Sequence, residues 1–208
     1  MKLKKGIKRL IIIILIILLI IIGILFYRQY FSNGKETKEI KIVNSIEKYD
    51  YKLKENKSKN YKKLFKELKE ILKKESLDEE EYVKKISEMF IVDFYTLTDK
   101  ITKSDVGGVD FVHKDVMENF LLNAEDTYYK YLESNLYNNR NQKLPEVDKV
   151  TIESVTTSPF ASASNTDEKS YVVKTTWTYT DTDFSKYQSE ATLIFVHEDN
   201  KLYLVELQ

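Results

Sequence analysis

Residues 169–180 read KSYVVKTTWTYT, and this stretch decides the fold of the chain. β-Branched and aromatic side chains fill it with a period of two, which is typical of a β-strand. One face carries Tyr171, Val173, Thr175, Trp177 and Tyr179, and the other carries Val172, Lys174, Thr176 and Thr178. We therefore predict a strand that presents an aromatic face on one side.

Similar strand patterns lie on both sides of this stretch. Residues 148–157 precede it, and residues 187–197 and 202–207 follow it, each with alternating apolar residues. The connections are short, and the one at 158–168 consists mostly of small and polar residues. Because short connections join neighbouring antiparallel strands, we predict a four-stranded antiparallel meander.

Helical periodicity dominates the sequence upstream of the strands. Apolar residues recur every three or four positions over 59–74, 78–98 and 114–138. Ser76, with Glu79 three positions later, has the spacing of a capping box and predicts the start of the second helix. Together with the meander, these segments predict an α+β domain, in which helices pack on a curved, cone-like sheet.

Asp93 is the one carboxylate that falls within the apolar face of the helix predicted at 78–98. A buried carboxylate needs polar partners. We interpret Asp93 as a structural residue held by a tyrosine, by Trp177 or by backbone N–H groups, and a general base in a polar cavity is the alternative. Because tyrosine buries its ring and still offers a hydroxyl, the candidate lining of a ligand cavity is Asp93, Tyr128, Tyr131 and Trp177.

The composition excludes several kinds of chemistry. The chain has no cysteine, which removes disulfides, thiolate metal sites and cysteine nucleophiles. Its two histidines, His113 and His197, are too few for a histidine-rich metal site. The adjacent Gly107 and Gly108 lack the spacing of a phosphate-binding loop. We therefore predict no catalytic residues, no metal site, no cofactor and no enzymatic activity.

Residues 10–27 read LIIIILIILLIIIGILFY and carry no charge. A helix of this length is about 27 Å long, close to the hydrocarbon thickness of a bilayer, so we predict a transmembrane helix. A cleaved signal peptide is the alternative, but its apolar region is shorter and is followed directly by a small-x-small site. Because basic residues stay on the cytoplasmic side, the N-terminus is predicted to be cytoplasmic. The orienting residues are Lys2, Lys4, Lys5, Lys8 and Arg9.

The formal net charge of zero hides an uneven distribution. Five of the 33 basic residues lie in 1–9, which leaves 28 against 33 acidic residues, a net charge of −5, in the rest of the chain. We predict a tether at 28–48, in which an apolar patch is either helix or strand, and an extracytoplasmic domain at 49–208 that begins with a short strand. The excess of acidic residues disfavours nucleic acid as a partner. Lysine far outnumbers arginine, which indicates a low-GC bacterium.

The element order, helices followed by a curved meander that ends at Lys201–Leu207, resembles the nuclear-transport-factor-2-like cone fold. A single N-terminal span ahead of such a domain is similar to the assembly-factor subunits of type IV secretion and conjugation systems. This resemblance implies a non-catalytic scaffold at the cell membrane. Its implied partners are the lipid bilayer, other membrane or envelope proteins and a second copy of the chain.

The scaffold hypothesis predicts an exposed aromatic patch on the sheet, formed by Tyr171, Trp177 and Tyr179. Two alternatives remain. The cone either binds a small ligand or is the cavity of an enzyme in which Asp93 acts as the base.

Overall fold

The computed structural model describes residues 14–23, 40–162 and 166–208. The chain divides into two units, Met1–Glu39 and Ile40–Gln208. The first unit is described over one helical segment, residues 14–23. Within the ranges described, no helix has both the length and the hydropathy needed to cross a membrane. The remainder of the predicted span at 10–27, the basic residues of 1–9 and the predicted tether up to Glu39 lie outside the described residues.

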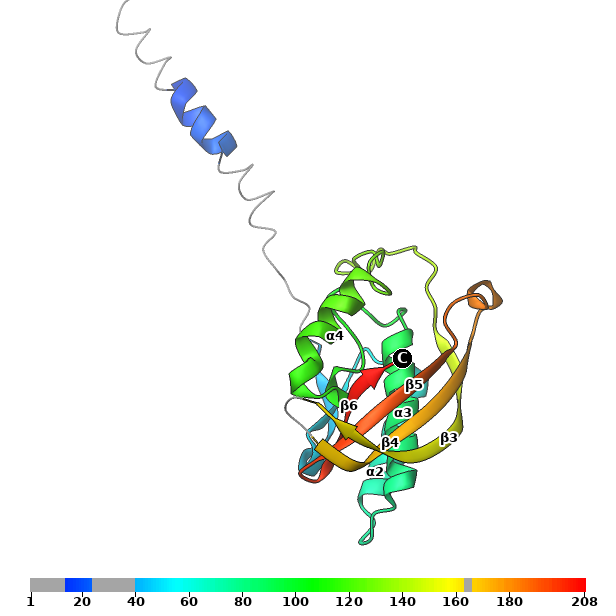
Figure 1. The fold of residues 1–208 in the computed structure, drawn as a ribbon. Helices are drawn as coiled ribbons and strands as arrows, with labels where there is room; N and C mark the ends of the chain where they lie inside the picture. The colour runs from blue at the N-terminus through cyan, green and yellow to red at the C-terminus, as the bar shows by residue number, and fades with distance from the viewer. Residues whose placement is uncertain (1–13, 24–39, 163–165) are drawn as a thin grey trace, which may run out of the picture. The chain divides into compact units, whose positions relative to one another are not determined.

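The second unit is an α+β domain built on a four-stranded antiparallel sheet (Figure 1). The strands are β3 (Val147–Ala161), β4 (Thr166–Tyr179), β5 (Glu190–Glu198) and β6 (Lys201–Leu207), hydrogen-bonded in the order β3-β4-β5-β6. This order confirms the predicted meander. β3 and β4 extend into the connection predicted at 158–168, because its small and polar residues pair across the hairpin, as at Ala161 and Thr166.

The long β3–β4 pair is irregular. Its register shifts at three places, which leave Asp148, Glu153 and Pro159 without a direct partner on β4. Such bulges bend a strand and increase its twist. Figure 1 shows the resulting sheet curving around α3 (Glu79–Tyr95).

The first two predicted helices are present with small changes at their ends. α2 (Lys59–Leu72) begins after Ser58, whose hydroxyl accepts the N–H of Tyr61 at 3.2 Å. α3 begins after Asp78, so the predicted cap at Ser76 is wrong. The carboxylate of Asp78 accepts the N–H groups of Glu80 and Glu81, and its negative charge is favourable at a helix N-terminus.

α3 is the centre of the core. Its C-terminal half, from Met89 to Tyr95, is buried on every side, although the periodicity predicts only one buried face. The remaining elements supply apolar side chains around it, including Phe65 and Leu68 of α2 and Leu193 and Phe195 of β5. The aromatic face of β4 belongs to this core.

The third predicted helix is shorter than expected. α4 covers Lys114–Asp126, whereas the periodicity predicts a helix to residue 138. The chain leaves the helix because two consecutive tyrosines turn into the core. The hydroxyl of Tyr128 donates to the Tyr95 carbonyl at 2.9 Å, and that of Tyr129 donates to the Phe94 carbonyl at 2.7 Å.

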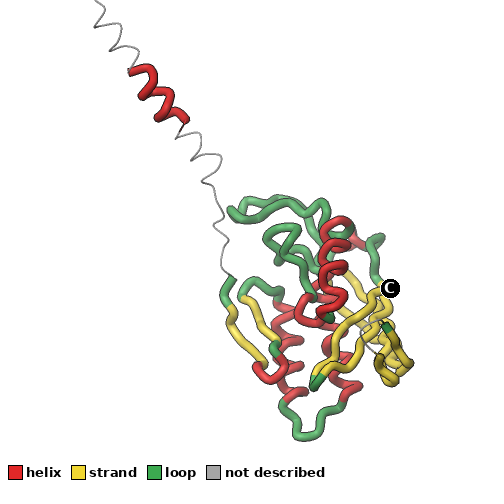
Figure 2. The backbone as a smooth tube through the Cα atoms, turned by 60° about the vertical axis from the view of Figure 1, so that its left-hand side comes forward, coloured by secondary structure: helices red, strands yellow, loops and turns green. Residues whose placement is uncertain are grey.

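A two-stranded antiparallel hairpin lies beside the helices, separate from the four-stranded sheet (Figure 2). It consists of β1 (Ile42–Ile46) and β2 (Tyr51–Lys54). The apolar patch within 28–48, for which the sequence allows either helix or strand, forms the strand β1. β1 also places residues 42–46 in the compact unit, which begins at Ile40, rather than in the tether predicted at 28–48.

Candidate functional site

A groove separates α4 from the edge of the sheet. Val116, Phe120 and Ala124, four residues apart on one side of α4, face Leu204 and Leu207 of β6. The groove encloses about 440 Å³, and the aromatic residues Phe94, Tyr95 and Tyr128 also line it. We call it the α4–β6 groove.

The groove exists because α4 is fastened at its two ends. At the N-terminal end, the His113 N–H donates to the Leu204 carbonyl at 2.8 Å, and Val112 forms a parallel bridge to Leu204. At the C-terminal end, the hydroxyls of Tyr128 and Tyr129 reach the last turn of α3. Between these ends, Ala124 is the one fully buried residue of α4.

Amide side chains form the rim of the groove. Asn119 and Asn123 stand one turn apart on α4, and in the described part of the chain neither side-chain amide has a hydrogen-bond partner. Gln188 and Gln208 lie at the opposite rim. The groove therefore combines an apolar floor with amides that donate and accept hydrogen bonds, and Glu206 is the one charged side chain among its described lining residues.

The titratable groups at the groove are not suited to acid–base chemistry. Burial raises the pKa of Tyr128, and its hydroxyl already donates to the Tyr95 carbonyl. Burial likewise raises the pKa of Tyr95. The carboxylate of Glu206 accepts the side-chain amide of Gln208 at 2.6 Å.

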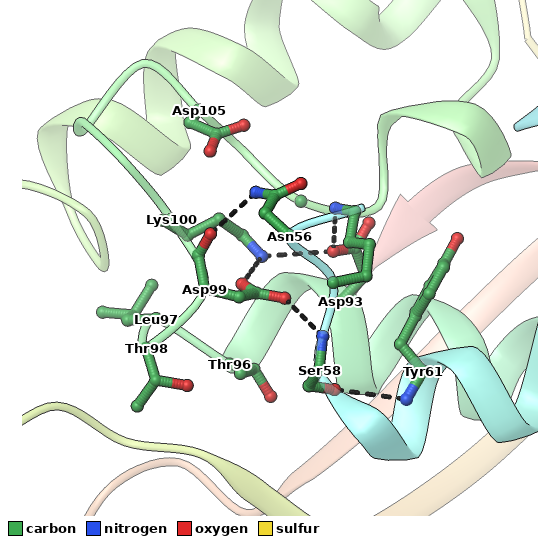
Figure 3. Close-up of polar contacts among 12 residues, drawn as sticks. Asn56, Ser58, Tyr61, Asp93, Thr96, Leu97, Thr98, Asp99, Lys100 and Asp105 are labelled. Atoms are coloured by element: carbon green, nitrogen blue, oxygen red, sulfur yellow. Dashed lines mark hydrogen bonds and ion pairs between the residues drawn. The ribbon is translucent and has the colours of Figure 1, made fainter. Parts of the chain in front are cut away.

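Asp93 lies in a buried ion cluster rather than in the groove (Figure 3). Its Oδ1 accepts Lys57 Nζ and, at 3.1 Å, Lys100 Nζ, while its Oδ2 accepts the Gly108 N–H at 2.8 Å. Lys100 also pairs with Asp99 at 2.5 Å. The side chains of all four charged residues are at most 7% exposed. Two lysines and two aspartates thus neutralise each other away from water.

The neighbouring charges of this cluster favour the ionised forms of Asp93 and Lys100. Burial opposes the charged form of Asp93, but the neighbouring charges of Lys57 and Lys100 and the Gly108 N–H outweigh it, and the pKa of Asp93 lies well below its usual range. Burial also acts to lower the pKa of Lys100, but Asp93 and Asp99 outweigh it, and that pKa is raised. A carboxylate fixed in this way is not available as a base.

The cluster joins segments that are far apart in sequence. Lys57 precedes α2, Asp93 lies in α3, and the connection after α3 supplies Lys100 and Gly108. Gly108 has a φ of +78°, and a Cβ there would lie 2.7 Å from the ring of Phe90. A Cβ at Gly107 would overlap the Asp93 carbonyl oxygen, so both glycines serve close backbone packing.

Of the four residues predicted to line a cavity, one lines the α4–β6 groove and the other three lie elsewhere. Tyr128 lines the α4–β6 groove, whereas Asp93 lies in the ion cluster. Trp177 is 4% exposed and packs in the core, with its ring 4.3 Å from that of Tyr95. Tyr131 is 78% exposed because α4 ends before it, so it does not line the groove.

The partners of Asp93 differ in part from those predicted. A backbone N–H is confirmed as a partner of Asp93, but the side chains that bind it are lysines rather than a tyrosine or Trp177.

The predicted exposed aromatic patch on the sheet is wrong. Trp177 is buried, and Tyr171 and Tyr179 are half-buried against the same core. The face of β4 that carries them is covered by helices.

Both histidines bind carboxylates. His113 caps α4, with Nδ1 accepting the Asp115 N–H at 3.2 Å, and its Nε2 lies 2.5 Å from Glu198. His197 Nδ1 lies 2.8 Å from Asp167. Among the described residues, no group of three or more histidines and carboxylates is arranged to hold a metal ion.

No protein-family model matches this chain, and no curated protein or solved structure does either. Within the described ranges, the α4–β6 groove is the feature best suited to a binding role.

Proposed function

We propose that this chain is a single-pass membrane protein whose domain of residues 40–208 is a non-catalytic binding module outside the cell membrane. In this role it holds a membrane or envelope protein through the α4–β6 groove. The observation that carries the proposal is the composition of the groove, an apolar floor with four amide side chains and a single charged side chain, Glu206, around it. Such a surface recognises a partner by burial and hydrogen bonding.

The chemistry of the charged residues supports binding rather than catalysis. Asp93 is neutralised by Lys57 and Lys100, away from the groove. Tyr128 and Glu206, which do line the groove, are each engaged in a hydrogen bond within the domain. A general acid or base must reach the proton that it transfers, and these groups are occupied.

Charge and hydropathy support the location. The apolar run at 10–27 has a suitable length for a bilayer, and the five basic residues of 1–9 favour a cytoplasmic N-terminus. The order of elements in the domain supports the likeness to the cone-fold assembly factors of secretion and conjugation systems. We therefore place the binding module in a membrane-associated assembly.

A small apolar ligand is the second candidate for the groove. The volume of about 440 Å³ lies within the range of small-molecule sites, roughly 300 to 1,000 Å³. A small ligand and a protein partner differ in mass, so one experiment separates them.

Photo-crosslinking from the rim of the groove tests the proposal in the membranes of the source cells. Asn123→p-benzoylphenylalanine places the reactive group at the groove, and Glu118→p-benzoylphenylalanine is the control on the exposed side of α4. We expect one discrete protein adduct from position 123 and none from position 118. A second substitution that fills the groove, Val116→Trp, should remove the adduct, whereas Glu118→Trp should not.

The possible outcomes of this experiment are distinct. A small-molecule adduct from position 123 would favour the second candidate. Equal adducts from both positions, or none from position 123, would contradict a binding role for the groove.

A further inference from the structure

We infer that the α4–β6 groove takes an extended peptide segment, which adds a strand to the free edge of β6. This inference rests on the proposed function and specifies the chemistry of the partner. The four observations that carry it are the direction of the backbone groups on β6, the segment that already occupies part of this edge, the spacing of the amides on α4 and the floor beneath them.

The backbone of β6 offers unpaired groups to the groove. Thr192 of β5 and Gln208 exchange both of their backbone hydrogen bonds, each at 2.9 Å. In an antiparallel ladder, the residue next to such a pair directs its own N–H and C=O away from the partner strand. That residue is Leu207, which lines the groove. Within the described residues, no hydrogen bond takes up its N–H or its carbonyl on that side.

The chain itself shows that this edge accepts a strand. Val112 forms a parallel bridge to Leu204, and the His113 N–H donates to the Leu204 carbonyl. The pairing stops there because the chain turns into α4 at Lys114. The edge between Leu204 and Leu207 thus continues past the residues that start to cover it. This part of β6 bulges at Val205 and spans at most roughly 10 Å, which a short peptide segment would fill.

The opposite wall matches the repeat of a strand. Asn119 and Asn123 are four residues apart on α4, a rise of about 6 Å along the helix. Alternate residues of a strand are roughly 6.6 Å apart. The two amides are therefore spaced to bind alternate backbone groups on the outer edge of an added strand, while Leu207 binds its inner edge.

The floor of the groove sets the side-chain preference of the peptide. Leu207 stands opposite Leu193, which is fully buried, so the two side chains share the face of the sheet that packs on the helices. A guest residue paired with Leu207 directs its side chain to the same face, towards Phe94 and Phe120. The groove therefore selects a segment in which an apolar residue stands between polar neighbours, with no charge at its centre.

The direct test compares two peptides with identical side chains. The first is a short peptide in which leucine or valine alternates with serine, with a terminal lysine for solubility and a fluorescent label. The second has the same sequence, with alternate backbone amides N-methylated so that they cannot donate. Binding to the full-length chain in phospholipid nanodiscs is measured by fluorescence anisotropy. We expect the methylated peptide to bind at least about tenfold more weakly, because strand addition depends on backbone hydrogen bonds.

Variants of β6 test the same hydrogen bonds from the side of the protein. Leu207→Pro removes the N–H that points away from β5 and keeps the ladder bonds of Gln208, since an edge strand tolerates proline. Leu207→Val is the matched control, which keeps the N–H. We expect Leu207→Pro to weaken binding of the unmethylated peptide at least about tenfold and Leu207→Val to weaken it by less than about threefold. The fluorescence of Trp177 confirms that each variant is folded.

Each outcome decides between the two proposals. Equal affinities for the two peptides would overturn strand addition and leave the groove as a site that recognises apolar side chains. A lack of binding by both peptides, while the adduct at position 123 still forms, would overturn strand addition alone. A lack of both binding and adduct would overturn the binding role of the groove as well.

Discussion

The backbone N–H of His113 donates to the carbonyl of Leu204 at 2.8 Å and ties the start of α4 to the edge of β6. The imidazole of the same residue caps the helix and lies 2.5 Å from Glu198 on β5. One residue thus fixes both the start of α4 and the attachment of this helix to the edge of β6. The α4–β6 groove lies between these two elements.

The His113 cap gives the first prediction. His113→Asn keeps an acceptor for the Asp115 N–H, whereas His113→Ala removes both the cap and the contact with Glu198. We expect His113→Ala to lower the free energy of unfolding by about 1 kcal/mol more than His113→Asn does, the usual value of an N-cap. Urea denaturation measures both values. Equal losses would show that the imidazole does not stabilise α4 as a cap.

The buried ion cluster gives a second prediction. Asp93→Asn leaves Lys57 and Lys100 without their shared carboxylate, and breaking a buried pair from one side costs about 3–5 kcal/mol. Lys84→Met, in the exposed pair with Glu80, is the control and should cost less than about 1 kcal/mol. Similar losses in the two variants, measured by urea denaturation, would contradict the stabilising role of the cluster.

The same cluster predicts a dependence of stability on pH. The pKa of Asp93 is lower in the folded chain than in the unfolded one, so its contribution is present above the unfolded pKa of about 3.9. That contribution is lost as the pH falls further, through the folded pKa. The difference in unfolding free energy between the wild type and Asp93→Asn should therefore be constant near neutral pH and shrink below about pH 4. A difference that stays constant in acid would show that Asp93 does not gain its low pKa on folding.

Two tyrosines provide a matched pair for a fourth prediction. The hydroxyl of Tyr129 accepts the Gly107 N–H at 3.0 Å and donates to the Phe94 carbonyl at 2.7 Å, in a fully buried site. Tyr129→Phe leaves both groups unsatisfied and should cost about 1–3 kcal/mol. Tyr131→Phe alters an exposed side chain and should change stability by less than about 0.5 kcal/mol. Thermal unfolding of both variants checks this, and an unchanged stability of Tyr129→Phe would contradict the two hydrogen bonds of the Tyr129 hydroxyl.

Gly108→Ala gives the last prediction. The φ of +78° is unfavourable for any residue with a Cβ, and the added methyl would meet the ring of Phe90 at 2.7 Å. We expect a loss of about 1–3 kcal/mol in the free energy of unfolding. An unchanged midpoint of urea denaturation would show that the connection after α3 is free to rearrange.

The sheet could be predicted from the sequence because its signal is local. Alternation over 169–180 and its neighbours identifies β3 to β6 and their order, since short connections leave few other topologies. The end of α4 could not be predicted in this way. Apolar periodicity continues past Asp126, but the hydroxyls of Tyr128 and Tyr129 find carbonyls on α3, and tertiary contact overrides the helical pattern.

The candidate site was harder to predict than the fold. The inward position of Asp93 follows from helical spacing, but its partners Lys57 and Lys100 do not, because buried lysines are rare and these two lie in separate connections. The groove depends on contacts between α4 and β6, which no local pattern reports. A local signal for its helical wall did exist, since Val116, Phe120 and Ala124 are flanked by Asn119 and Asn123.

Trp177 is the only tryptophan of the chain. Its ring lies 4.3 Å from that of Tyr95, which in turn lies 5.1 Å from the ring of Tyr128 at the groove. The path from the groove to the indole thus crosses a single aromatic neighbour. We therefore expect a ligand bound in the groove to change the tryptophan fluorescence of the unlabelled protein.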